Sequence, residues 1–225
     1  MGHFGSRLLS YVKEQVIESF DSEFSGRLDV SLVNGRQVLN SPSSNYSFGT
    51  LHKVFRTALD AEGLKLIELS PVLILGLGAG SVVHILHQEW KYDVKITGVE
   101  KDAAVLAAGK KYFGLGDDPL LEIVKADAQD YVTRCSNPFG LVIVDLFIGK
   151  DVPSQFEEDY FWSRLGRLVK SPGMLIFNKM VYDEQTRAQS AHLQDLAQKN
   201  FEQVRVRRIA GPWENHIIIG ENVKE

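Results

Sequence analysis

The residues best suited to chemistry are three alternating glycines and one acid. Gly76, Gly78 and Gly80 follow one apolar run, and Glu100 closes the next. Glycines there let the backbone turn tightly into a helix while a ligand approaches the bare main chain. A carboxylate at the end of the second run is placed to accept hydrogen bonds from the two hydroxyls of a ribose. The pair predicts a nucleoside site, against the simpler interpretation of a turn that only joins a strand to a helix.

The glycine spacing indicates which nucleoside. The nicotinamide fingerprint G-x-G-x-x-G/A has its third small residue, Gly or Ala, at the position that Ser81 fills here. In this chain the glycines instead alternate, at Gly76, Gly78 and Gly80. Alternating glycines are typical of S-adenosylmethionine-dependent transferases, so this segment resembles the class I methyltransferases. The resemblance implies a cofactor of that kind.

Two further acids follow later apolar runs. The resemblance implies that Asp127, with Ala128 beside it, accepts a hydrogen bond from the adenine amino group. Asp127 is equally well placed to cap a helix that starts at Ala128. Asp145 ends the run L-V-I-V-D, and burying an unpaired carboxylate there is costly without a functional reason. By resemblance, Asp145 lies near the methionine end of the cofactor and near the acceptor.

Strands and helices alternate from residue 67 to the end of the chain. Strands are predicted over 72–76, 94–100, 121–124, 141–145 and 174–178, with helices between and after them. This order implies a doubly wound parallel sheet covered on both faces. The last two runs, 203–209 and 216–220, are too close for a parallel crossover and must form an antiparallel hairpin. The fold class is therefore α/β, Rossmann-like, mostly parallel with an antiparallel C-terminal strand, in a domain spanning 67–225.

A smaller region, residues 1–66, precedes that domain. Apolar residues at helical spacing between Leu8 and Phe20 predict an amphipathic helix. Two strands, 28–33 and 36–39, meet at Asn34-Gly35, a strong hairpin signal. A polar loop and a helix over 50–62 complete the region.

Composition narrows the functional classes. The 25 basic and 29 acidic residues leave a net charge of −4, which provides no general attraction to nucleic acid or to an anionic membrane. Because no apolar run has the length of a bilayer span and no signal peptide is recognisable, we expect a cytoplasmic protein. Cys135 is the only cysteine. His84 and His87 lack a third ligand nearby, so no metal is predicted.

A closer resemblance covers nearly the whole chain. The segment 99–113, V-E-K-D-A-A-V-L-A-A-G-K-K-Y-F, is similar to the motif that follows the second strand in the spermidine synthase family, which also carries an N-terminal β-hairpin region. The resemblance implies either S-adenosylmethionine or its decarboxylated form as cofactor, and a homodimer.

The reaction is the open question. Aminopropyl transfer to a polyamine uses acidic residues that the family supplies from its N-terminal region and from an Asp-rich loop. This chain keeps the first loop acid, Asp145, but has Ile148 in place of the second, and it has no acidic residue between Asp29 and Asp60. Asp151 and Glu157 begin an acidic cluster that we assign to a solvated helix start rather than to polyamine binding.

The preferred interpretation is a methyltransferase that acts on a small-molecule acceptor. Asp145 would orient or deprotonate the acceptor, and Tyr46 and Phe147 would line its pocket. We expect a neutral to positive pocket, favouring neutral or anionic acceptors, because of four basic residues, Arg36, Lys53, Arg56 and Lys150. The alternatives are an aminopropyltransferase and a non-catalytic module that binds a nucleoside or a partner.

Overall fold

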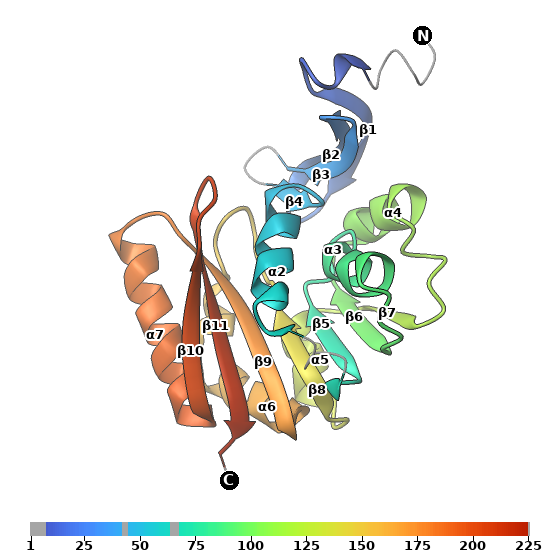
Figure 1. The fold of residues 1–225 in the computed structure, drawn as a ribbon. Coiled ribbons are helices and arrows are strands. Elements are labelled where there is room, and N and C mark those ends of the chain that lie inside the picture. Colours follow the sequence, from blue (N-terminus) through green and yellow to red (C-terminus); the bar gives the residue numbers. More distant parts are fainter. Residues whose placement is uncertain (1–7, 42–44, 64–67, 225) are drawn as a thin grey trace.

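The computed structural model describes residues 8–41, 45–63 and 68–224, with Asn45 and Tyr46 described by their backbone only. The chain forms two sheets, a small N-terminal one and a large one that makes up most of the body (Figure 1). No helix in the described ranges is long and apolar enough to cross a membrane.

The large sheet has seven strands in the order β10-β11-β9-β8-β5-β6-β7. Their bounds are β5 (Val72–Leu75), β6 (Ile96–Glu100), β7 (Leu121–Lys125), β8 (Phe139–Val144), β9 (Val169–Val181), β10 (Phe201–Ile209) and β11 (Glu214–Val223). Neighbours from β7 to β9 pair in parallel, whereas β11 runs antiparallel between β9 and β10. The predicted fold class and terminal hairpin are confirmed.

Helices cover both faces of the large sheet. Their bounds are α2 (Thr50–Asp60), α3 (Ser81–Val83) with a π-helical continuation (His84–Glu89), α4 (Ala103–Tyr112), α5 (Ala128–Arg134), α6 (Asp159–Leu168), which follows a 3-10 turn (Ser154–Glu157), and α7 (Glu184–Asn200). One apolar core joins α2, α3 and α4 to the first face, and a second joins α5, α6 and α7 to the other. The sheet edge at the carboxyl ends of β5, β6 and β8 stays available for a site.

The small sheet has the order β1-β2-β3-β4. Its strands are β1 (Gln15–Ser22), β2 (Gly26–Val33), β3 (Arg36–Asn40) and β4 (Asn45–Ser47). The hairpin at Asn34-Gly35 is confirmed, since both residues adopt the positive φ that such a turn requires, 49° and 74°. Figure 1 shows this sheet at one end of the large one, with α2 leading away from it.

The predicted N-terminal amphipathic helix is wrong. Among the described residues, only Leu8 and Leu9 are helical before Gln15, and β1 pairs antiparallel with β2 from Gln15 onward. The register shifts between Val16 and Glu18, as in a β-bulge. The extra residue changes the phase of the side chains along the strand, which gives the apolar residues a spacing that imitates a helix. The polar loop expected over 40–47 also contains a short strand, β4.

Contacts with α4 and with the residue before it help to hold the small sheet against the large one. Ser22 Oγ donates to Asp102 Oδ2, and Glu18 accepts from Lys111 and Tyr112. These contacts bring the β1–β2 turn, with Phe24, to the carboxyl end of β6. The N-terminal region therefore contributes to the site edge of the sheet.

Candidate functional site

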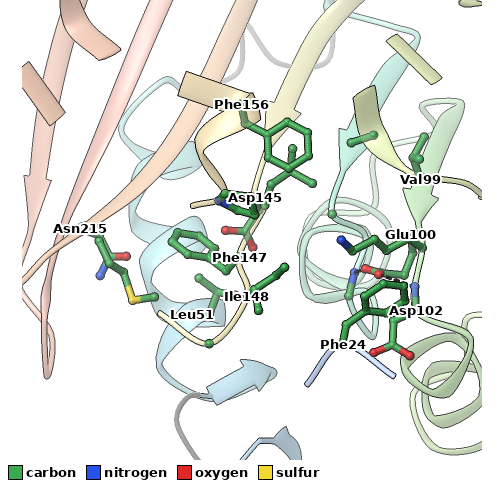
Figure 2. Close-up of a pocket in the computed structure, with 18 of the residues that line it drawn as sticks. Phe24, Leu51, Val99, Glu100, Asp102, Asp145, Phe147, Ile148, Phe156 and Asn215 are labelled. Atoms are coloured by element: carbon green, nitrogen blue, oxygen red, sulfur yellow. Dashed lines mark hydrogen bonds between the residues drawn. The ribbon is translucent and has the colours of Figure 1, made fainter. Parts of the chain in front are cut away.

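A cavity opens at the carboxyl ends of β5, β6 and β8 (Figure 2). It collects residues from the glycine turn, from the ends of three parallel strands and from α2 and the C-terminal hairpin. Among the predicted residues that line it are Gly76, Gly78, Glu100, Asp127, Ala128, Asp145 and Phe147. The structure therefore brings these seven predicted residues together at one cavity.

One predicted residue is outside the described lining, and the side chain of another is not described. Gly80 is not among the described residues that line the cavity; it lies in the left-handed region, with φ 97°, and caps the start of α3. Its α-carbon faces Leu115, because an added Cβ would come within 2.4 Å of Leu115 Cδ2. The side chain of Tyr46 lies outside what the structure describes, so its predicted acceptor role stays a prediction.

The backbone amides of the glycine turn are all used inside the protein. Each N–H from residue 76 to residue 80 donates to a protein oxygen at 2.9–3.1 Å: Gly76 and Leu77 to the Val99 carbonyl, Gly78 to Glu100 Oε2, Ala79 to Ser47 Oγ and Gly80 to the Leu77 carbonyl. A pyrophosphate is held by free amides of such a turn. This turn has none to offer, and a carboxylate lies beside it.

Position 76 requires glycine because the ends of β5 and β8 approach each other closely there. It has φ 86°, and a Cβ built on it would lie 2.1 Å from the carbonyl oxygen of Asp145. The absence of a side chain lets the end of β8 lie against the end of β5, where the Asp145 N–H donates to Leu75 O at 2.8 Å. Gly76 thus positions Asp145 in addition to lining the cavity.

Gly76→Ala should destabilise the protein by roughly 2–5 kcal/mol, from left-handed backbone strain and overpacking together. Gly116→Ala is the matched control, because a Cβ there meets only Lys110 Cγ, at 3.8 Å. Chemical denaturation of both variants measures the difference. Equal stabilities would contradict the close approach.

Glu100 connects the glycine turn to the next helix. Its carboxylate accepts from the Gly78 N–H and the Asp102 N–H, both at 3.0 Å, and its side chain is largely buried. Burial raises the pKa of Glu100, and the hydrogen bonds from the Asp102 and Gly78 amides oppose that rise. Each carboxylate oxygen keeps a further lone pair for a ligand hydroxyl.

Asp127 caps α5, as one of its two interpretations requires. Its Oδ1 accepts from the Gln129 N–H at 2.8 Å, and Lys101 Nζ lies 3.9 Å from its Oδ2. Because Asp127 and Ala128 both line the cavity, capping leaves Oδ2 available to a ligand. The role toward adenine stays a prediction.

Asp145 is the carboxylate at the centre of the cavity (Figure 2). Burial raises its pKa to about 7; the hydrogen bond from Asn178 opposes the rise, and the negative charge of Glu100 adds to it. Asn178 Nδ2 donates to Asp145 Oδ1 at 3.0 Å and so fixes the orientation of the carboxyl group. A carboxyl group with a pKa near 7 is suited to accept a proton at neutral pH.

Sequence reasoning missed most of the other half of the cavity; it had singled out only Phe147 and Ile148, in the segment after Asp145. Its walls come from α2, β9, the loop after Asp145 and the C-terminal hairpin: Thr50, Leu51, Val54, Ile148, Gly149, Met180, Pro212, Trp213 and Asn215. Phe24 from the β1–β2 turn also reaches the lining, and Lys101 Nζ lies 4.4 Å from the centre of its ring. The sequence did carry a signal for the C-terminal hairpin. Because β11 runs antiparallel to β9, it begins at the sheet edge where β9 ends, so the loop before β11 lies beside the site.

The expected positive pocket is not what the structure has. None of the four basic residues belongs to the described lining of the cavity: Arg36, Lys53, Arg56 and Lys150. Arg56 pairs with Glu89 at 2.7 Å, and Lys150 Nζ lies 3.7 Å from the ring centre of Tyr182. In the half of the cavity opposite the glycine turn, Asp145 is the one ionisable side chain of the described lining.

The acidic cluster after Asp145 is not simply a solvated helix start. Asp151 accepts a hydrogen bond from the Tyr182 hydroxyl. Glu157 pairs with Lys179 at 2.7 Å, and the Lys179 side chain is only 1% exposed. Both carboxylates therefore have partners away from the described cavity lining.

A family model matches residues 60–212, more than half of the chain, and describes a spermine/spermidine synthase domain. The chain belongs to this family. Among curated proteins, it is 29% identical over 128 residues to the eEF1A lysine and N-terminal methyltransferase homologue of Drosophila melanogaster, covering 53% of this chain and 19% of that protein. It is also 29% identical over 119 residues to a polyamine aminopropyltransferase of Korarchaeum cryptofilum, covering 50% of this chain and 36% of that protein.

The chain thus matches well under two thirds of the length of either curated relative. Solved structures share its fold. A probable spermidine synthase from Corynebacterium glutamicum has a TM-score of 0.70 at 19% identity, covering 92% of this chain and 80% of that one. Human methyltransferase-like protein 13, in complex with SAH, has a TM-score of 0.62 at 22% identity, covering 78% and 83%. The chain is thus similar both to proteins named for methyl transfer and to proteins named for aminopropyl transfer.

Proposed function

We propose that this protein is an S-adenosylmethionine-dependent methyltransferase acting on a small-molecule acceptor. The observation that carries the choice of reaction is the acceptor half of the cavity, where Asp145 is the carboxylate and the other described walls are neutral. A methyl group needs only an oriented nucleophile and a proton acceptor. A polyamine would need additional negative charge.

The glycine turn supports the choice of cofactor. The amides of residues 76–80 are bonded within the protein, so a pyrophosphate would find no free donors in the turn itself and would face the Glu100 carboxylate. A nucleoside without phosphate avoids both problems, and its ribose hydroxyls match the remaining lone pairs of Glu100. Asp127 Oδ2 would take the adenine amino group, with Val99, Ala126 and Leu146 as the apolar surroundings of the ring.

S-adenosylmethionine, when bound, would supply an activated methyl group; its sulfur–methyl bond would break as the bond from that carbon to the acceptor forms, and the sulfur would keep the electron pair. The acceptor loses a proton, and we assign its capture to Asp145. Asn178 holds the Asp145 carboxyl group in place through its 3.0 Å hydrogen bond. Apolar walls, Phe147 among them, offer no hydrogen-bonding group that would hold water beside the acceptor.

Aminopropyl transfer is the second candidate, and family membership is the observation that favours it. The side chains around the acceptor half argue against aminopropyl transfer. Ile148 occupies the position of the family's second loop acid, and the nearest replacements, Asp151 and Glu157, are bonded to Tyr182 and Lys179. The homodimer implied by the resemblance is part of this proposal and is measurable by light scattering.

Glu100→Ala should weaken the binding of S-adenosylhomocysteine by roughly 1–3 kcal/mol, because it removes an acceptor of two ribose hydrogen bonds. Isothermal titration calorimetry measures the change, and we expect micromolar affinity for the unaltered protein. Unchanged affinity in the variant would show that the ribose is held elsewhere. NADH binding as tightly as S-adenosylmethionine would overturn the cofactor assignment.

A screen of small nucleophiles with S-adenosylmethionine tests catalysis itself. Mass spectrometry for the demethylated product scores turnover. Tight cofactor binding without turnover of any acceptor would favour the third candidate, a nucleoside-binding module that catalyses nothing.

A further inference from the structure

Asn215 has a buried oxygen with no partner. The residue is 4% exposed and lines the cavity near the start of β11. Its Nδ2 donates to the Trp213 carbonyl at 3.3 Å, and since only the nitrogen can donate to a carbonyl, Oδ1 is the atom left over. Oδ1 has no hydrogen-bond donor among the described residues. Buried polar atoms are nearly always bonded, so an occupant of the cavity is the natural donor.

The strand register places Asn215 on the same face of the sheet as Asn178, the residue that donates a hydrogen bond to Asp145. Asn215 is opposite Met180, and Ile217 is opposite Asn178. Residues two apart on a strand share a face, so Asn178, Met180 and Asn215 all face the side on which α2 packs. Figure 2 shows Asn215 and Asp145 at separate places along the cavity, with Phe147 between them.

The lining between these two polar groups is largely apolar. Leu51, Ile148, Met180 and Trp213 contribute to this half of the lining, and beside them the hydroxyl of Thr50 is uncharged. A cation at the Asn215 end would lose its water without meeting a carboxylate there, and an anion would meet the unpartnered oxygen. A neutral N–H or O–H group satisfies the oxygen at the smallest desolvation cost.

We propose that Asn215 determines acceptor specificity: its Oδ1 accepts a hydrogen bond from an uncharged N–H or O–H group at the end of the acceptor remote from the nucleophile. The substrate class is an elongated, largely apolar molecule with a nucleophilic nitrogen or oxygen at one end and a neutral hydroxyl or amide at the other. This inference rests on the proposed function, since it names the acceptor of the same site. It removes anionic molecules from the expected acceptors.

Four matched series of primary amines test the inference. They have three to eight methylene groups and end in a hydroxyl, a methyl, an ammonium or a carboxylate. Binding to the protein loaded with S-adenosylhomocysteine is measured by calorimetry, so that no turnover is needed. We expect the best hydroxyl-ended amine to bind at least tenfold more tightly than its methyl-ended counterpart, since a site built to hydrogen-bond a group rejects the analogue that lacks it.

Two variants assign the preference to Asn215. Asn215→Leu should bring the hydroxyl-to-methyl ratio to about one, and Asn215→Asp should shift the preference to the ammonium-ended series. Unchanged affinity for S-adenosylhomocysteine shows that each variant is folded. The same ranking in the unaltered protein and in Asn215→Leu would overturn the inference, as would failure of every hydroxyl-ended amine to bind.

The outcomes separate this inference from the proposed function. The tenfold discrimination without methyl transfer from S-adenosylmethionine would retain the inference and count against the methyltransferase. Methyl transfer to an acceptor whose affinity is the same in Asn215→Leu would retain the enzyme and overturn the role of Asn215.

Discussion

Asp145→Asn should lower kcat for methyl transfer by about 10²- to 10⁴-fold, the range for loss of a general base. The amide keeps the shape of the carboxyl group but cannot take a proton. Calorimetry with S-adenosylhomocysteine should give nearly the same affinity as the unaltered protein, because Glu100 and Asp127 carry the proposed nucleoside contacts. A variant that retains most of its turnover would show that the acceptor loses its proton elsewhere.

The pH dependence of kcat follows from the same residue. Asp145 has a pKa of about 7 because of its burial, and only the ionised carboxylate accepts a proton. The rate should therefore rise as the pH increases through about 7 and level off above it. Asn178→Ala is the control: it keeps the carboxyl group but removes the hydrogen bond that lowers its pKa, so the inflection should move to higher pH. An inflection that stays in place would contradict this assignment.

The fold of the large domain was predictable because its strands are buried on both faces. Continuous apolar runs such as 141–144 identify central strands, and their alternation with helices leaves few topologies. The link between β10 and β11 was short enough to fix their antiparallel pairing. Local patterns and long-range packing agree in this region.

The N-terminal region shows where local pattern failed. Val16 and Phe20 have helical spacing, but the bulge between Val16 and Glu18 makes that spacing compatible with a strand. The choice depends on pairing with β2 and on contact with α4, where the rings of Phe20 and Tyr112 lie 6.4 Å apart. Such contacts between distant residues have no periodic signature.

The candidate site also has a part that was predictable from the sequence and a part that was not. The residues of the proposed cofactor site lie at or just past the carboxyl ends of strands, so motif and topology pointed to Glu100, Asp127 and Asp145 together. Residues of the proposed acceptor half, such as Leu51 and Trp213, come from elements far apart in the chain. The basic residues misled the charge prediction because net charge along a segment does not say which side chains face the cavity.

Incubation with decarboxylated S-adenosylmethionine and putrescine should yield no appreciable spermidine, with a rate at least about 10³-fold below the ordinary enzymatic value of about 1 per second. Putrescine carries two positive charges, and the acceptor half offers Asp145 alone among its described walls. Mass spectrometry for spermidine measures the rate, beside the methyl-transfer screen under the same conditions.

Ile148→Asp provides the matched control for this result. Ile148 lines the cavity and is 42% exposed, so a carboxylate fits there without burial and restores the second loop acid of the family. If missing negative charge is the reason for inactivity, this variant should form spermidine faster than the unaltered protein. Spermidine formation at about 1 per second without the substitution would instead mean that Asp151 or Glu157 leaves Tyr182 or Lys179 and turns into the cavity during catalysis, and the proposed reaction would be overturned.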